Sequence, residues 1–295
     1  MEKIMKTLIV VFVCAPFLCT QVYGVPTAEE VATEWVKNYG SIKDYNVAYT
    51  ETFLETSELI EPNSPANWYS FLRIDTKVRR DGCYNTKLYM TIKDTNFAYH
   101  YIFDGIDQCV FLLEGSGKDN TPTVFLNGEN IYASMKDRDS FKDALLTRTS
   151  SRGQTLLEFY LTFRNPDRDV RVRPAFETIS GVECVVLEFF VPANKENPYA
   201  IGWFAHEKGM LVMKWMQFSR IDLTVYEIAS NKNGLWYPRR AVRNDGEGTI
   251  FKKCTREIVI EDFVPDSNFP DSVFKCDISP GTRVYDQRIG VEYVK

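Results

Sequence analysis

The sequence is poor in the residues and motifs that usually carry catalysis or hold a metal ion. Its 295 residues include two histidines, His100 and His206, and neither belongs to a ligand-spaced motif such as H-E-x-x-H. It has no C-x-x-C pair, no G-x-S-x-G nucleophile turn and no G-x-G-x-x-G phosphate loop. We therefore expect no catalytic residue, no bound metal and no cofactor.

The sequence also lacks a second apolar stretch after its N-terminal one. That stretch runs from Leu8 to Leu18, follows two lysines and is too short to span a bilayer of about 30 Å comfortably. A basic start, an apolar run and a small-residue end at Gly24 are typical of a secretory signal. We predict a cleaved signal at 1–24 and an exported chain at 25–295, in the periplasm or cell envelope. A retained membrane anchor is the alternative.

Basic residues are outnumbered by acidic residues. Cleavage of the predicted signal removes two lysines and one glutamate and leaves a net charge of −6. Nucleic-acid binding requires a basic surface, and the exported chain has few basic doublets, among them Arg79-Arg80 and Arg239-Arg240. We interpret these doublets as solvated strand ends and exclude nucleic acid as a partner.

Cysteines are spaced widely and are odd in number after cleavage. Spaced cysteines pair in an oxidising compartment, and an odd count leaves at least one free or paired between chains. Cys184 alternates with apolar neighbours and is expected to be a small buried residue. The pairing stays open for the five cysteines of the exported chain, Cys83, Cys109, Cys184, Cys254 and Cys276.

Periodicity predicts one helix followed by many strands. Thr27 and Glu30 form a capping box, and apolar residues at helical spacing predict a helix over about 27–39. The period then changes to two, and Asp81-Gly82 and Asp104-Gly105 mark tight turns between strands. Strands in runs without alternating helices favour an antiparallel sheet in one α+β domain over 25–295. A helical insert is expected at about 137–163.

Aromatic and methionine side chains alternate on several predicted strands. Residues two apart share one face of a strand, so these stripes can form the concave wall of a curved sheet and hold an apolar ligand there. An ordinary filled core is the alternative. The predicted cavity-lining residues are Tyr45, Val47, Tyr49, Phe71, Tyr99, Tyr101, Met213 and Trp215.

Several segments resemble the LolA/LolB-like outer-membrane lipoprotein-sorting proteins, in particular larger, divergent members. The resemblance begins with the helix Ala28–Tyr39 and the following Ile42-Lys43-Asp44-Tyr45. It continues at Ile201–Leu211, at Asn233-Gly234-Leu235-Trp236-Tyr237-Pro238, and at the C-terminal Phe269–Phe274 and Pro280–Asp286.

The resemblance implies an unclosed, curved half-barrel of mainly antiparallel strands, with helices covering a concave apolar cavity for acyl chains. It also implies that an arginine on an early strand holds the helical lid, a role open to Arg73, Arg79 or Arg80. The helical insert and the five cysteines depart from the small carrier.

Three functions follow as hypotheses. The first is a non-catalytic extracytoplasmic protein that binds a lipid, a lipoprotein acyl chain or another apolar ligand. The second is a periplasmic protein-interaction or sensor domain on the same fold, with an envelope protein as partner. The third is a hydrolase without a recognised motif. The sequence leaves the ligand and the oligomeric state open.

Export gives a direct prediction. N-terminal sequencing of the protein recovered from its cell envelope is expected to begin at Val25 or within a few residues of it, because the small-residue end of the signal lies there. Recovery of the mature protein with Met1 intact would contradict the predicted cleavage.

Overall fold

The computed structural model describes most of residues 25–295. The residues described are 24–40, 42, 44–56, 69–79, 81, 83–92, 95–114, 123–127, 169–191, 195–217, 220–245 and 254–295. The predicted helical insert at 137–163 and the predicted signal up to residue 23 lie outside them. No helix within these ranges is both long and apolar enough to cross a membrane.

The first element is the predicted helix. Helix α1 (Ala28–Trp35) continues into one π-helical turn, η1 (Val36–Gly40). Its start is the predicted capping box: the Thr27 backbone N–H donates to Glu30 Oε2 at 2.7 Å, and the Glu30 N–H donates to Thr27 Oγ1 at 3.2 Å. The helix predicted over about 27–39 is therefore confirmed.

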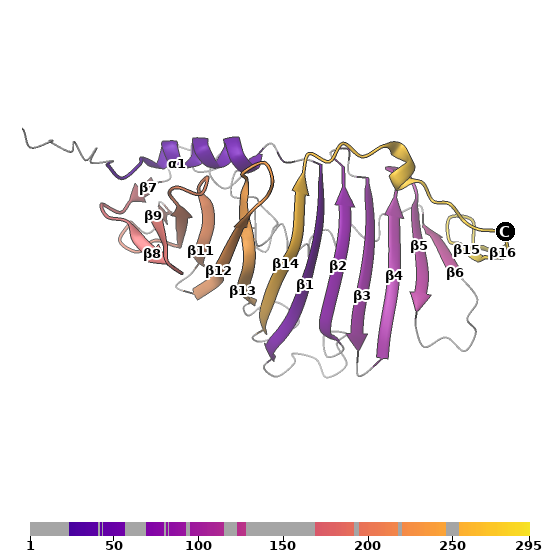
Figure 1. Ribbon diagram of the computed structural model, residues 1–295. Helices are drawn as coiled ribbons and strands as arrows, with labels where there is room; N and C mark the ends of the chain where they lie inside the picture. The colour runs from indigo at the N-terminus through magenta and orange to yellow at the C-terminus, as the bar shows by residue number, and fades with distance from the viewer. Residues whose placement is uncertain are drawn as a thin grey trace, which may run out of the picture.

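All strands of the described residues join one sheet whose two ends do not meet, and among these strands only β6 and β15 pair in parallel. The order across the sheet is β16-β15-β6-β5-β4-β3-β2-β1-β14-β13-β12-β11-β10-β9-β7, and β8 pairs with β9. The predicted α+β, mainly antiparallel and unclosed architecture is confirmed (Figure 1). The strands are β1 (Tyr45–Thr56), β2 (Tyr69–Val78), β3 (Tyr84–Ile92), β4 (Thr95–Phe103), β5 (Gln108–Glu114), β6 (Thr123–Asn127), β7 (Asp169–Val172), β8 (Glu177–Ile179), β9 (Val182–Phe190), β10 (Ala200–Ala205), β11 (Leu211–Gln217), β12 (Arg220–Ser230), β13 (Trp236–Asp245), β14 (Cys254–Pro265), β15 (Arg283–Asp286) and β16 (Val291–Val294).

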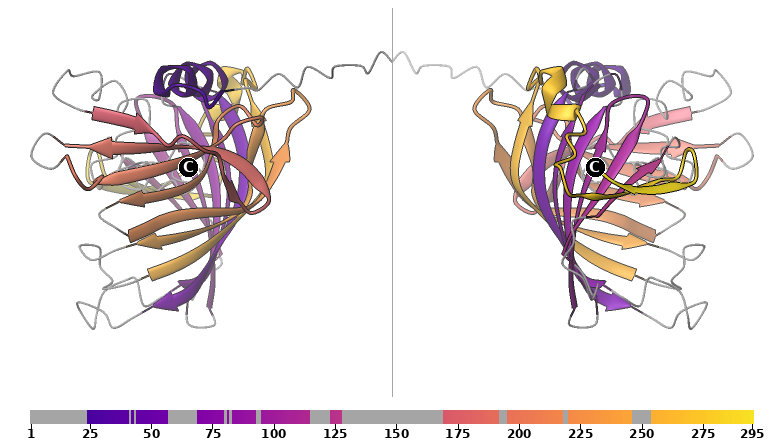
Figure 2. Two further views of the ribbon diagram at one scale, coloured as in Figure 1. Left: turned by 90° about the vertical axis from the view of Figure 1, so that its left-hand side faces the viewer. Right: turned by 90° about the vertical axis from the view of Figure 1, so that its right-hand side faces the viewer.

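We call the face of the sheet that carries Val47 and Tyr49 the inner face. Val31, Trp35 and Tyr39 of α1 and η1 pack into the same buried cluster as these two residues, so the helix covers part of this face. Figure 2 shows the sheet from both ends, twisted and curved, with α1 across its upper margin. Burial of this apolar stripe of α1 is the main source of its stability, because so short a helix is marginal alone.

The opposite, outer face carries a second, smaller core beneath the C-terminal segment. We call residues 266–282 the strap, because they connect β14 to β15 at the far end of the sheet (Figure 1). Phe274 of the short helix η3 (Asp271–Phe274) is buried. Asn85 Nδ2 donates to the Val273 carbonyl at 2.7 Å, and Arg79 pairs with Asp271.

A disulfide fixes the strap to the sheet. Cys109 on β5 bonds Cys276 across a sequence separation of 167 residues, beside buried Ile102 and Val124. Cys83 and Cys184 are buried free thiols, and burial raises the pKa of Cys184 to about 12. The expected small buried role of Cys184 is confirmed. The side chain of Cys254 lies outside the described residues.

Removal of this disulfide is expected to destabilise the protein. The double variant Cys109→Ser/Cys276→Ser should lose about 2–5 kcal/mol of unfolding free energy in urea titrations, because a long closed loop no longer restricts the unfolded chain. A reductant should lower the midpoint of the wild type and leave that of the variant unchanged. Equal midpoints for the two proteins without reductant would contradict the structural role of this bond.

Candidate ligand-binding face

The inner face is completely filled beneath α1. Five predicted cavity-lining residues have exposed fractions of 3% or less, and all five belong to the main buried cluster that includes the helix. Side chains with so little exposed surface are core residues. For these five residues the structure therefore agrees with the alternative of an ordinary filled core. They are Tyr45, Val47, Tyr49, Met213 and Trp215.

Gly202 shows how tightly this region is packed. It lies opposite Trp215 in the pairing of β10 with β11. A Cβ at position 202 would lie 2.7 Å from ring atoms of both Phe204 and Trp215. Real carbon contacts are much longer, so the glycine is what allows the two rings to lie against the backbone.

The substitution Gly202→Ala tests this packing. The added methyl group is expected to lower the unfolding free energy by about 1–3 kcal/mol, because the aromatic rings must move off their positions. The loss should be smaller in a Trp215→Phe background, which removes the nearest ring atoms. A neutral or stabilising effect of Gly202→Ala would show that space remains beside Trp215, and urea titration measures either result.

On β4, the inner face carries a row of half-buried aromatic side chains. Tyr99 and Tyr101, the sixth and seventh predicted residues, lie here with Phe97 and Phe103 on β4; we call these four side chains the aromatic row. The rings of Phe97 and Tyr99 are stacked with centroids 6.5 Å apart, and those of Tyr99 and Tyr101 are 5.9 Å apart. Both tyrosines contact the main core.

Neighbouring strands extend this surface. Tyr101 lies opposite Val110 on β5, which lies opposite Phe125 on β6. Tyr285 on β15 stacks on Phe125 at 5.3 Å. Phe125 and Tyr285 are absent from the sequence-based list because β6 and β15 have only five and four residues, too few for alternation to be recognised.

The surface is uncharged at neutral pH. Burial raises the pKa of Tyr101 to about 12, with a further increase from Tyr99, and burial also raises the pKa of Tyr99. Thr76 and Thr86, which lie on the same face, share a buried hydrogen bond of 2.6 Å between their hydroxyl groups. A surface of neutral aromatic rings is suited to apolar ligands.

Phe71, the eighth predicted residue, lies on the wrong face. In β2 the inner positions are Leu72, Ile74 and Thr76, and Phe71 points outward with an exposed fraction of 38%. The prediction that it shares a face with the others is wrong. Alternation within one strand gives two stripes, and only pairing with β1 decides which of them is inner.

The arginines proposed for the lid role lie elsewhere. Arg73 is on the outer face and pairs with Glu261 at 2.8 Å. Arg79 pairs with Asp81 and Asp271 and lies over the Phe274 ring, so it holds the strap. The expectation that one of these two holds a lid over the concave side is therefore wrong, and Arg80 lies outside the described residues.

The two histidines occupy unrelated places. His100 Nε2 lies 2.7 Å from Asn85 Oδ1 on the outer face, and burial, with Lys87 and Lys77 nearby, lowers its pKa. His206 stacks obliquely on Phe176 at 5.0 Å. Within the described ranges no group of three histidine, cysteine or acidic side chains is placed to hold a metal ion.

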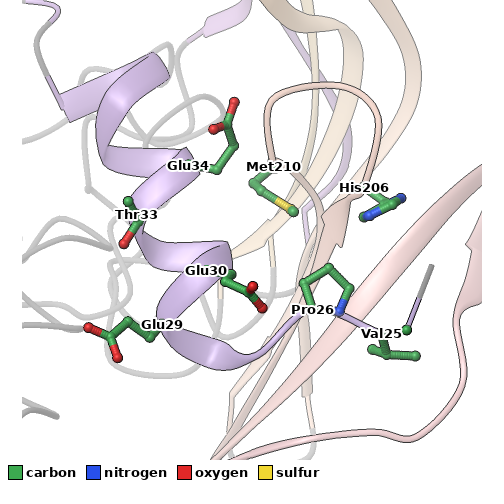
Figure 3. Close-up of a pocket in the computed structure, with 9 residues that line it drawn as sticks. Val25, Pro26, Glu29, Glu30, Thr33, Glu34, His206 and Met210 are labelled. Atoms are coloured by element: carbon green, nitrogen blue, oxygen red, sulfur yellow. The ribbon is translucent and has the colours of Figure 1, made fainter.

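An open hollow of about 700 Å³ lies beside the start of α1. Figure 3 shows Met210 and His206 across it from the helix. Glu29, Glu30 and Glu34 line the helical side, and three carboxylates make this wall unsuitable for an apolar chain. The aromatic row is the better candidate site.

Comparisons with known proteins found similarity between this chain and solved structures only. No family model matches the sequence, and neither does any curated protein. An outer membrane lipoprotein-sorting protein domain from Vibrio parahaemolyticus is 12% identical, with 85% of this chain and 96% of that one covered and a TM-score of 0.41. The Mycobacterium tuberculosis lipoprotein LppX is 10% identical over 83% and 99%, with a TM-score of 0.31. LprF from Mycobacterium bovis is 9% identical over 84% and 97%, with a TM-score of 0.34.

These three similarities carry no argument about function. Their TM-scores and identities are low, so the function has to be inferred from the inner face itself.

Proposed function

We propose that this protein is a non-catalytic binding protein of the cell envelope that holds a lipid, a lipoprotein acyl chain or another apolar ligand against its inner face. The observation that supports this most directly is the aromatic row. Phe97, Tyr99, Tyr101 and Phe103 are half-buried side by side on one strand, while the same face beneath α1 is fully packed.

The physical driving force is burial of apolar surface. Each methylene group removed from water contributes about 0.8 kcal/mol. The rings of Tyr99 and Tyr101 provide a flat, uncharged wall on which a chain can lie, and Leu88 and Leu112 flank Tyr99 across the strands. Affinity therefore depends on the area of this wall.

The aromatic row gives a sharp test. Tyr99→Glu places a charge on the wall and is expected to weaken binding of a neutral fluorescent acyl ester by at least about tenfold, because an unpaired carboxylate resists burial. Fluorescence titration of the purified mature chain measures the effect.

Tyr89→Glu is the matched control. Tyr89 lies on the neighbouring strand β3 but on the outer face, with an exposed fraction of 41%. Its substitution should leave affinity unchanged, and circular dichroism should show both variants folded. Absence of acyl ester binding by the wild type, or equal loss in both variants, would contradict the proposed function.

A further inference from the structure

One end of the sheet is formed by β16, and one side of this strand has no partner strand within the described ranges. In the strand order β16 stands last and pairs with β15. Figure 1 shows both strands at the end of the sheet remote from β7 and β8, beside the C-terminus. We call the side of β16 that faces away from β15 the open edge.

The backbone of β16 presents hydrogen-bonding groups at the open edge. The Lys295 N–H donates to the Thr282 carbonyl at 3.0 Å, and the Lys295 carbonyl accepts from the Gly281 N–H at 2.7 Å. Both backbone groups of Lys295 therefore point toward the β15 side. Because these groups alternate in direction along an antiparallel strand, those of Glu292 and Val294 point to the open edge.

The side chains of β16 are mostly apolar and are exposed on both faces. Val291 and Tyr293 are on the outer face, opposite Asp286 and Val284, with exposed fractions of 48% and 41%. Val294 is on the inner face, with an exposed fraction of 67%. None of the three belongs to either hydrophobic core of the described residues. Packing within the chain therefore does not account for them, and an exposed apolar edge is a template for pairing with another strand.

A second copy of this chain fits the open edge. Identical edges related by a two-fold axis pair antiparallel, and the backbone directions allow hydrogen bonds only through residues 292 and 294. Glu292 opposite Glu292 would oppose like charges, which is destabilising. Val294 opposite Val294 would leave the backbone groups of Glu292 unpaired, because β16 ends at Val294.

The remaining register satisfies both residues. Glu292 opposite Val294 occurs twice by symmetry, so all the backbone groups that β16 presents at the open edge are paired. Tyr293 then lies opposite Tyr293 on the two-fold axis, and cross-strand aromatic pairs are stabilising. The carboxylate of Glu292 is already paired with Arg283 of its own copy at 3.5 Å.

The opposite end of the sheet is less suited to pairing. On β7, Asp169 and Arg171 form an ion pair of 2.7 Å with about half of each side chain exposed. Charged side chains on an edge strand oppose pairing with another strand. Association is therefore expected at β16 and between like edges.

We propose that β16 pairs with β16 of a second copy about a two-fold axis, with Glu292 opposite Val294 and Tyr293 opposite Tyr293. The two sheets then join into one. This interaction surface goes beyond the proposed ligand-binding function and does not depend on it. Because β16 has four residues, the contact is small, and we expect a reversible dimer whose population rises with concentration.

Sedimentation velocity of the purified mature chain measures the association. The wild type is expected to show a monomer–dimer equilibrium. Val294→Glu places a carboxylate opposite Glu292 at two symmetric positions and should weaken the dimer by at least about tenfold. Within its own chain position 294 lies opposite Arg283, so the new carboxylate does not oppose the pairing of β16 with β15.

Ile289→Glu is the matched control. Ile289 has the same exposed fraction as Val294, 67%, but lies in the turn before β16 and outside the paired residues. This variant should associate like the wild type, and circular dichroism should show both variants folded.

Cysteine variants test the register without a change of charge. Tyr293→Cys should form a disulfide between copies at least about tenfold faster than Val291→Cys, because only directly opposite residues have Cβ atoms close enough to bond. In this register the two residues 291 are four positions apart along the strands, about 13 Å. Both variants lie on the same face, and the wild type gives the background from native thiols. Non-reducing electrophoresis measures the rates.

Several outcomes would overturn the proposal. A wild type that stays monomeric at its highest soluble concentration is one, and equal weakening by Val294→Glu and Ile289→Glu is another. Equal cross-linking rates of the two cysteine variants would exclude the register, and this readout decides if Val294→Glu does not fold. Growth beyond a dimer would indicate head-to-tail pairing of β16 with β7 and would also overturn it.

Discussion

The antiparallel pairing of β1 with β14 is the contact on which the rest of the structure depends. It joins the strands that precede residue 128 to those that follow residue 168 in one sheet. Its register places Val47 opposite Phe263 and Tyr49 opposite Ile260, with a bulge between residues 48 and 49. Because side chains alternate strictly along a strand, a slip of one residue would reverse the face of every side chain on β2 to β6. The filled region and the aromatic row both follow from this register.

Two different environments arise on the same face. Beneath α1, Gly202 lets Trp215 and Phe204 pack against the sheet, and the helix completes a core. Beyond it, the aromatic row on β4 is half-buried, while the strap and the Cys109–Cys276 disulfide stabilise the far strands from the outer face. Rigidity is therefore supplied from the outer side, so the inner side of these strands does not need to be filled to hold them in place.

The sequence carries enough information for the fold class but not for the site. The capping box at Thr27 and the alternation at Tyr45, Val47 and Tyr49 report local geometry, which is why the helix and the inner stripe of β1 are predictable. Alternation shows which side chains share a face of a strand but not how tightly they are packed. The pattern around Trp215 therefore fits a cavity wall and a filled core equally well. The prediction for Phe71 is wrong because the face on which this residue lies is set by the pairing of its strand with a partner strand.

The central claim is that the inner face holds an apolar ligand against the aromatic row. Native mass spectrometry of the full exported protein purified from its own envelope tests it most directly. We predict a bound species of lipid mass, and its loss from the Tyr99→Glu protein. A wild-type protein that carries no such species, and acquires none when incubated with the membrane lipids of its own cells, would contradict the account.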